Sequence, residues 1–308
     1  MKKQPAPRIS PEIQKGIQKF LDSLRGERNA SVHTLRAYRN ELDRFAEYIG
    51  PEARWKEIDH VSIRGFLSYL HSRRLSKVSV ARALAALRSI YKWLAREGMV
   101  QQNPAKLVAT PKLPKKLPRV PTMEEINGVL NTEMPDSATF PERDRAILEL
   151  LYGCGLRNSE LVGIELGDIE EANGVILVRG KGKKQRYVPL EGVAEEVLRA
   201  YRAARQKVLG EMHKSTRRLF INQRGGPLTT RSVARIVKQI AVANGLSPDI
   251  HPHTLRHAFG THMLSEGADL RAIQELLGHE RLSTTQKYTQ LSISHVMDVY
   301  DRTHPRAK

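Results

Sequence analysis

A proline-rich segment constrains the fold of this chain more than any other feature. Residues 101–122, QQNPAKLVATPKLPKKLPRVPT, contain five prolines. Because each proline removes a backbone donor and fixes φ, neither a helix nor an interior strand is expected to continue through this density. The segment therefore predicts an extended linker between two domains, and 308 residues are enough for each domain to bury its own core. We place the N-terminal domain at residues 1–106, the linker at 107–121 and the second domain at 122–308.

The part before the linker has the pattern of a helical bundle. Apolar residues recur at spacings of three and four, as in amphipathic helices, over residues 11–24, 31–49, 61–74 and 78–97. Ser31 is placed to cap the start of the second stretch, and Gly50 to end it. Four helices with one apolar face each predict a small bundle with a shared core.

A strong positive charge limits the classes of partner. The chain carries 51 Lys and Arg against 33 Asp and Glu, a net charge of +18, and residues 1–116 hold 24 of the basic residues but only 10 of the acidic ones. Such a field attracts a polyanion, most commonly nucleic acid. The candidates for DNA contact in this part are Arg36, Arg39, Arg82 and Arg88 on the helices and Lys112 in the linker. Solvated helix faces and an uncommitted linker are the alternative interpretation.

Several classes of protein are disfavoured. No apolar run approaches the roughly 18 residues of a membrane span, so no membrane insertion is expected. The basic start MKKQPAPRIS has no apolar stretch behind it, which argues against a secretory signal. The single cysteine, Cys154, cannot form an internal disulfide, and this fits a reducing compartment. We therefore expect a cytoplasmic, nucleoid-associated protein.

After the linker the pattern changes to helices mixed with short strands. Thr122 and Glu125 have the spacing of a capping box at the start of a helix. Two β-like runs, residues 175–178 and 186–190, flank a Gly-rich basic turn with Lys181 at its tip, which predicts a hairpin. Further helices are expected at residues 142–152, 193–209 and 269–277. The expected fold class is mainly α: an N-terminal helical bundle followed by an α+β domain with a small antiparallel sheet.

The stretch from His253 to Tyr288 gathers side chains that suit phosphate chemistry. His253 and Arg256 lie three residues apart in HTLRH, His279 ends the run LLGH, and Tyr288 follows nine positions later. Upstream, Arg157 lies on a glycine-containing turn before a new helix, a position that favours phosphate binding. Two guanidiniums and imidazole donors can stabilise charge on a phosphodiester while a tyrosine oxygen attacks it. The pattern predicts phosphoryl transfer on DNA.

Each of these residues alone also has a structural explanation. Arg157 could be the ion-pair partner of Glu160, and a helical His or a lone Tyr is more often part of a core. The departing sugar oxygen needs a proton, which a hairpin lysine or a His could donate. Lys183 and Arg186, beside the hairpin tip, are interpreted as phosphate contacts. It is the joint occurrence of these residues that makes the prediction specific.

The motifs resemble those of the tyrosine recombinase (phage integrase) family, and most closely its bacterial Xer branch, which includes XerC and XerD. The matching motifs are GLRNSE, GKGKKQR, HTLRH, LLGH and STTQKYT, and the similarity covers nearly the whole chain. The resemblance implies that Arg157 and Arg256 clamp the scissile phosphate. His253 and His279 would assist proton transfer, Lys181 would protonate the 5′ oxygen, and Tyr288 would become linked to the 3′ phosphate.

The resemblance also implies an assembly and a biological role. Relatives need neither a metal nor another cofactor for strand exchange, and their N-terminal core-binding (SAM-like) domain and catalytic domain form a C-shaped clamp on DNA. They act as homo- or hetero-tetramers, here with a second Xer-type recombinase, on a double-stranded recombination site through a Holliday junction. We expect chromosome-dimer resolution at cell division, with the DNA translocase FtsK as a possible partner. An integrase or transposase of a mobile element would use the same chemistry.

The C-terminal tail has two interpretations. Its start is amphipathic, with apolar residues at Ile293, Val296, Val299 and Tyr300. The tail could pack on its own domain or dock in a neighbouring protomer as in relatives, and we favour docking in the neighbour.

Three further functions fit parts of the sequence. A DNA-binding protein with a disabled site would share the charge, and a type IB topoisomerase would share the chemistry as a monomer. A metal-dependent hydrolase could use the histidines at positions 251, 253, 257 and 262, but Cys or clustered carboxylate ligands are missing nearby.

Overall fold

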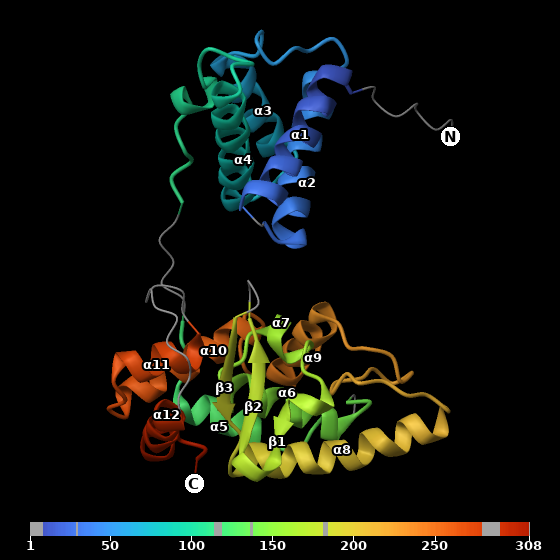
Figure 1. Ribbon diagram of the computed structural model, residues 1–308, viewed down its shortest axis with the longest axis vertical. Coiled ribbons are helices and arrows are strands. Elements are labelled where there is room, and N and C mark those ends of the chain that lie inside the picture. The colour runs from blue at the N-terminus through green and yellow to red at the C-terminus, as the bar shows by residue number, and fades with distance from the viewer. Residues whose placement is uncertain are drawn as a thin grey trace. The chain divides into compact units, whose positions relative to one another are not determined.

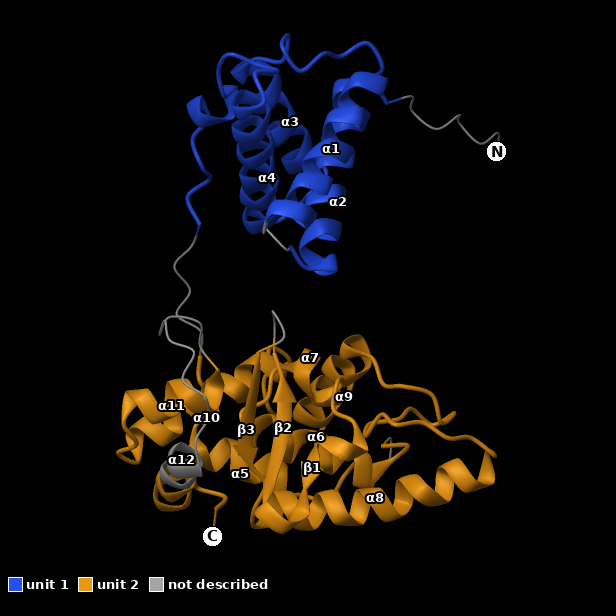
Figure 2. Ribbon diagram, viewed as in Figure 1, with its two compact units in different colours: residues 1–117 blue, residues 118–308 orange. Residues whose placement is uncertain are grey.

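The chain forms two compact units, residues 1–117 and 118–308 (Figure 2). The computed structural model describes residues 9–28, 30–113, 119–135, 138–180, 184–278 and 290–307, with the backbone alone for residues 28 and 290–296. Each unit has its own hydrophobic core. Within the described residues, no helix is long and apolar enough to cross a membrane.

The first unit is the predicted four-helix bundle. Its helices are α1 (Pro11–Arg28), α2 (Val32–Ile49), α3 (His60–Ser72) and α4 (Lys77–Arg96) (Figure 1). Ser31 caps α2 as expected, its hydroxyl accepting from the Thr34 amide at 3.2 Å. The apolar faces meet in a core in which Phe45, Phe66 and Tyr91 are fully buried. The spacing of apolar residues was therefore sufficient to predict this bundle.

The chain after α4 differs from the expected extended segment. Pro104–Leu107 form a 3-10 turn, η1, in which proline occupies the first turn, where its missing N–H is not needed. The Arg88 guanidinium donates to the carbonyl oxygens of Ala105 (3.1 Å) and Val108 (2.6 Å) and to the Thr110 hydroxyl (2.9 Å). Arg88 thus fastens this segment to α4. Three of its donor groups are taken within the unit, so the DNA contact expected of Arg88 stays a prediction that these bonds do not favour.

The second unit combines helices with a three-stranded antiparallel sheet. The strands are β1 (Ile169–Glu170), β2 (Val175–Arg179) and β3 (Gln185–Pro189), in the order β1-β2-β3. Val178 pairs with Arg186 and Val175 with Pro189, which confirms the predicted hairpin. The short β1 was not predicted; it follows the 3-10 turn η2 (Leu166–Asp168) and precedes another, η3 (Glu171–Asn173).

The helices of the second unit begin and end close to the predicted positions. Thr122 and Glu125 form the expected capping box at the start of α5. The helices are α5 (Met123–Asn131), α6 (Pro141–Gly153), α7 (Asn158–Leu161), α8 (Val193–Glu211), α9 (Thr230–Ala243), α10 (Pro252–Ser265), α11 (Leu270–Leu277) and α12 (Gln290–Thr303). The core gathers around α6, which packs against α8, α9 and α10. This arrangement confirms the expected fold class of a helical bundle followed by an α+β unit.

The C-terminal helix packs on its own unit. α12 lies against α10, α11 and β3, and Val299 and Tyr300 belong to the core. His304 is buried between aromatic rings, stacked on Tyr300 with 4.6 Å between ring centroids. The described part of the tail therefore packs on its own domain, which is the alternative that we did not favour. Tyr300 and His304 find aromatic partners within the same unit, so this end of the helix has no apolar face left to cover.

Candidate active site

Arg157 begins the site on a turn between α6 and α7. Gly155, with a φ of +57°, makes the turn, and a Cβ at this position would lie 2.7 Å from a ring carbon of Phe259. Arg157 then occupies the N-cap of α7, and Glu160 lies in its first turn. The Arg157 amide donates to Glu160 Oε2 at 2.8 Å, and its Nη1 donates to Oε1 at 2.7 Å. The ion pair that the sequence left as an alternative is present.

Arg256 reaches the same carboxylate from the first turns of α10. Its Nη1 donates to the carbonyl oxygen of Gly155 and its Nη2 to that of Leu277. Nη1 also lies 3.6 Å from Glu160 Oε2, close enough for an ion pair but not for a hydrogen bond. The structure thus brings Arg157 and Arg256 together around Glu160.

Arg186 is a third arginine at Glu160, and its position differs from the prediction. Its Nη1 and Nη2 donate to Glu160 Oε1 and Oε2, each at 2.9 Å, and its Nε donates to the carbonyl oxygen of Leu276 at 2.7 Å. The side chain is 4% exposed. This guanidinium therefore faces inward and is engaged by the protein itself, and the phosphate contact expected of Arg186 stays a prediction.

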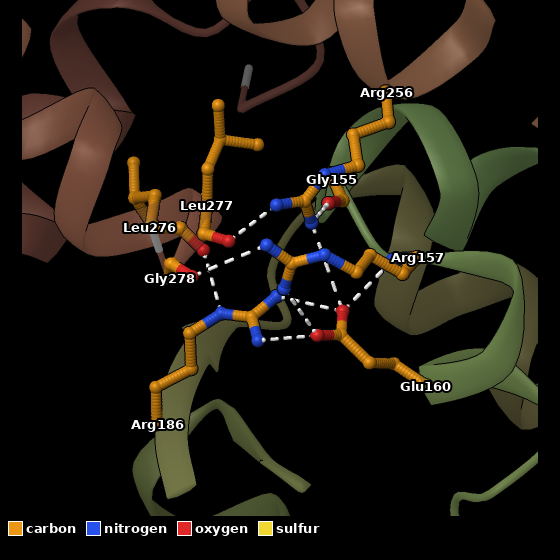
Figure 3. A network of polar contacts seen from close by, with 8 residues as sticks. All are labelled: Gly155, Arg157, Glu160, Arg186, Arg256, Leu276, Leu277 and Gly278. Atoms are coloured by element: carbon orange, nitrogen blue, oxygen red, sulfur yellow. Dashed lines mark hydrogen bonds and ion pairs between the residues drawn. The ribbon is translucent and has the colours of Figure 1, made fainter. Parts of the chain in front are cut away.

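The three arginines hold the C-terminal end of α11 (Figure 3). Arg186, Arg256 and Arg157 donate to the carbonyl oxygens of Leu276, Leu277 and Gly278, in that order along the chain. These carbonyls have no partner further along the helix, and cations at a helix C-terminus are favourable. Gly278 ends α11 in the left-handed conformation, with a φ of +62°. The next residue in the sequence is His279, so this network fixes the backbone that leads into it.

The cluster keeps an excess of positive charge. Exposed fractions are 3% for Glu160, 5% for Arg256 and 40% for Arg157, which is the most open of the three arginines. Burial alone would raise the pKa of Glu160, but the hydrogen bonds and charge of Arg186, together with the bonds from Arg157, lower it to about 2. Burial and the charge of Arg157 lower the pKa of Arg256. Three guanidiniums against one carboxylate suit an anion such as a phosphodiester.

His253 lies one turn before Arg256 on α10, at the surface of the unit. Partial burial, followed by the charges of His251 and Arg256, lowers the pKa of His253, which favours the neutral ring. His251 is the N-cap of α10: its Nδ1 accepts from the Thr254 amide at 3.1 Å. A capping histidine was not predicted, although its position just before Pro252 is a signal of a helix start.

Four of the predicted site residues lie outside the described residues: Lys181, Lys183, His279 and Tyr288. The residues that flank two of these gaps converge on the cluster. A Cβ on Gly180 would lie 3.9 Å from Glu160 Oε1, and Gly278 is bound by Arg157. The base of the hairpin is closed by the Gly180 amide, which donates to the Lys184 carbonyl at 2.8 Å.

The predicted DNA contacts of the first unit differ in how exposed their side chains are and in whether these side chains are already bonded within the protein. Arg36 and Lys112 are exposed, and neither side chain makes a hydrogen bond or an ion pair among the described residues. Arg39 donates to Gln18, and Arg82 pairs with the buried carboxylate of Glu41 at 2.7 Å while 61% of its side chain stays exposed. Arg36, Arg39, Arg82 and Lys112 therefore remain accessible to a phosphate to different degrees.

Sequence reasoning missed the inward direction of Arg186, although a signal was present. Side chains alternate along a strand, so Arg186 and Val188 share one face of β3. Val188 is apolar and fully buried, which places the Arg186 side chain in the interior as well. Within the described ranges, no cluster of three or more His, Cys, Asp or Glu side chains could hold a metal ion.

Comparison with known families adds an independent observation. A model of the phage integrase family matches residues 119–295, and a model of the phage integrase N-terminal SAM-like domain matches residues 17–98. This chain belongs to the phage integrase family. It is a tyrosine recombinase, as its motifs predict, and the SAM-like match coincides with the helical bundle of the first unit.

Similar recombinases match this one over nearly its whole length. The tyrosine recombinase XerC of Syntrophus aciditrophicus is 43% identical, over 96% of this chain and 98% of the relative. XerC of Pelobacter propionicus is 45% identical, over 95% and 96%. Among solved structures, the XerH site-specific recombinase bound to palindromic difH substrate, in a post-cleavage complex, is 25% identical with a TM-score of 0.66, over 92% and 83%. The predicted resemblance to the Xer branch is confirmed.

Proposed function

We propose that this recombinase cuts and rejoins DNA at a specific site through a covalent 3′-phosphotyrosine intermediate. The observation that carries the proposal is the cluster of Arg157, Arg186 and Arg256 around one buried carboxylate. The cluster has a net charge of +2 and includes one guanidinium that is open to solvent. Guanidiniums in such an excess suit the binding of a phosphodiester.

The chemistry is a pair of transesterifications. The Tyr288 phenol passes its proton to His253 or His279 as its oxygen attacks the scissile phosphorus. The bond to the 5′ oxygen breaks, and that oxygen takes a proton from Lys181. Arg157 and Arg256 bind the non-bridging oxygens and stabilise the charge that builds on them, with His253 and His279 as further donors. A 5′ hydroxyl from the partner strand then attacks the phosphotyrosine and releases Tyr288. Bond energy is retained throughout, so neither a metal nor ATP is required by this scheme.

Binding and assembly follow from charge and from the relatives. We propose that the first unit is the core-binding domain and that both units close around duplex DNA, with Arg36, Arg39, Arg82 and Lys112 on its phosphates. Lys183, beside the hairpin tip, would add a further phosphate contact. Four protomers, all alike or paired with a second Xer-type recombinase, would exchange strands through a Holliday junction. The similarity to XerC proteins favours a role in resolving chromosome dimers at cell division, in the cytoplasm and with a translocase such as FtsK.

The first experiment identifies the site and the nucleophile together. Purified protein is incubated with fragmented genomic DNA of its host, covalent adducts are recovered under denaturing conditions, and the attached ends are sequenced. A nicked duplex that carries the recovered sequence should then trap an adduct, and mass spectrometry should place the 3′ phosphate on Tyr288. The matched variant is Tyr288→Phe, which removes one oxygen. An adduct that persists in this variant would refute the assignment of the nucleophile.

The same adduct map separates the biological roles. A single symmetric locus in the chromosome indicates dimer resolution, whereas adducts at the ends of a mobile element indicate an integrase or transposase. Trapping in excess chelator tests the metal-free scheme, and loss of the adduct there would contradict it.

A further inference from the structure

Arg186 connects three segments that carry proposed catalytic residues. It lies on β3, a few residues after Lys181 in the sequence. Its two terminal nitrogens bind Glu160, in the helix that Arg157 caps, and its Nε binds the Leu276 carbonyl at the end of the helix that leads into His279. Figure 3 shows these contacts converging on one guanidinium. A single buried side chain thus links the supports of three functional groups.

The hydrogen bonds of Glu160 explain why a third arginine is needed. Oε1 accepts from Nη1 of Arg157 and of Arg186, while Oε2 accepts from the Arg157 amide and from Arg186 Nη2. A carboxylate has about four acceptor positions, so these four donors fill it. Arg256, whose Nη1 stays 3.6 Å from Oε2, makes no hydrogen bond to the carboxylate. Occupancy by Arg186 therefore limits the hold of Glu160 on Arg256.

The charge count points in the same direction. Arg157, Arg186 and Arg256 against Glu160 leave a charge of +2 for the phosphate. Without Arg186, this falls to +1, and two acceptor positions open on Glu160, whose Oε2 lies 3.6 Å from Arg256 Nη1. A buried carboxylate without its partner would draw that guanidinium away from the substrate, because unpaired charge in the interior is costly.

The end of α11 is shaped to receive Arg186. A Cβ on Gly278 would lie 3.1 Å from Arg186 Cδ and 3.3 Å from its Nη1, so the arginine stem packs directly against the glycine that ends the helix. This close approach is independent of the ion pair and would be lost with either residue. Arg186 therefore sets both the charge next to Arg256 and the position of the backbone before His279.

We propose that Arg186 is a positioning residue for recombination: it saturates Glu160, which keeps Arg157 and Arg256 available to a phosphate, and it anchors the backbone that leads into His279. This inference rests on the proposed function, because the phosphate that it serves is the scissile one. A purely structural ion pair would stabilise the fold equally well but would have no specific effect on the covalent step.

Four variants separate these roles: Arg186→Met, Glu160→Gln, the double variant, and Arg143→Met as the matched control. Arg143 is equally buried in the same unit, where it pairs with the buried Asp144 at 2.6 Å and lies 3.3 Å from the Ile221 carbonyl. Its loss therefore also leaves a buried carboxylate unpaired, but away from Glu160. Circular dichroism and unfolding midpoints establish that each variant folds.

The decisive quantity is the single-turnover rate of adduct formation on the nicked duplex, measured with saturating DNA, together with the Kd for that DNA. We expect Arg186→Met to slow the covalent step on the order of 100-fold, with a Kd within about threefold of the parent, because transition-state contacts are affected more than binding. The double variant restores the net charge of +2 and should recover at least about tenfold of the lost rate. Arg143→Met should stay within about threefold of the parent.

Two results would overturn the inference: an Arg186→Met rate within about threefold of the parent, or a double variant no faster than Arg186→Met.

A second measurement keeps the test independent of the covalent chemistry. The probe is inorganic phosphate at constant ionic strength, and the readout is the shift in unfolding temperature that it produces. If the parent protein forms no adduct at all, the proposed function fails. Arg186 retains its role only if Arg186→Met abolishes the phosphate shift and the double variant regains it.

Discussion

Arg306, two residues from the C-terminus, forms an ion pair with Glu149 in the middle of α6. Its Nε and Nη2 donate to the two carboxylate oxygens, and its Nη1 donates to Asn131 Oδ1 at 2.6 Å. The Glu149 side chain is 1% exposed, and the arginine is 10% exposed. This pair fastens the tail to the core of the second unit.

The pair predicts a large loss when only one partner is removed. Arg306→Met should lower the free energy of unfolding by about 3–5 kcal/mol, because it leaves a buried carboxylate without a cation. Burial already raises the pKa of Glu149, with Arg306 opposing the effect. A buried carboxyl with a raised pKa costs most where it must ionise, so the loss should be larger at pH 8 than at pH 5. Hydrogen exchange of residues 297–307 measures the release of the tail.

The control for this prediction is the double variant Glu149→Leu with Arg306→Met. It replaces the pair by apolar side chains of similar size and should recover most of the lost stability. Equal stability of the single and double variants would contradict the importance of the unpaired charge.

His304 predicts a pH dependence of the same tail. Burial, followed by the charge of Arg306, lowers the pKa of His304 to about 3, while its Nδ1 accepts from the Arg306 amide at 3.1 Å. Above about pH 6.5, the pKa of a histidine in the unfolded chain, the His304 ring is neutral in both the folded and the unfolded state, so its titration does not change the stability. As the pH falls below this value, the unfolded chain binds a proton that the folded chain refuses, so stability declines until about pH 3.

The expected loss of stability is about 2 kcal/mol at pH 5 relative to pH 8. This follows because pH 5 lies about 1.5 units below the unfolded pKa of about 6.5, and each unit is worth about 1.4 kcal/mol. Urea unfolding followed by circular dichroism measures this loss. Tryptophan fluorescence would report on the other unit, because both tryptophans, Trp55 and Trp93, lie in the first unit. In His304→Phe, which keeps the aromatic stacking, the difference between the two pH values should shrink by this amount. An unchanged difference would show that His304 does not titrate as inferred.

The capping histidine of α10 predicts a specific pattern of substitutions. His251→Ala removes the acceptor of the Thr254 amide and should cost about 1 kcal/mol of stability, together with a slower covalent step, because His253 and Arg256 lie in the first turns of this helix. His251→Asn should retain both properties, since asparagine is a strong N-cap. Chemical denaturation and adduct trapping measure the two. Equal losses of stability and rate in His251→Ala and His251→Asn would show that helix capping is not the role of His251.

Substitution of two arginines of the first unit should affect different properties: DNA binding for Arg36 and stability for Arg88. Arg36→Ala should leave stability within about 0.5 kcal/mol of the parent but reduce the salt dependence of DNA binding by about one phosphate contact. Arg88→Met should lower stability by about 2–3 kcal/mol through the loss of three hydrogen bonds and leave the salt dependence unchanged. Binding titrations over a range of salt concentrations decide between them. A reduced salt slope in a stable Arg88→Met protein would restore the DNA-contact interpretation.

Much of the fold was predictable because local patterns carry it. The spacing of apolar residues placed α1 to α4, and the capping-box spacing of Thr122 and Glu125 placed α5. The turn chemistry at Gly180 predicted the hairpin. The Pro104 turn was not predicted, since it is held by Arg88 from α4, a contact between separate segments. The direction of the tail was equally undetermined, because an amphipathic helix shows that it needs a partner surface but not which one.

The sequence by itself determined the chemical groups of the site and the family to which they belong. Arg157, His253 and Arg256 were identifiable from motifs, because residue type and local spacing are properties of the chain alone. Only the tertiary structure decided that Arg186 faces inward and shares Glu160 with two other arginines, and that all three bind the end of α11. The physical reason is that a buried ion pair is fixed by desolvation and by the packing of distant elements. Neither of these is visible in a local pattern of charges.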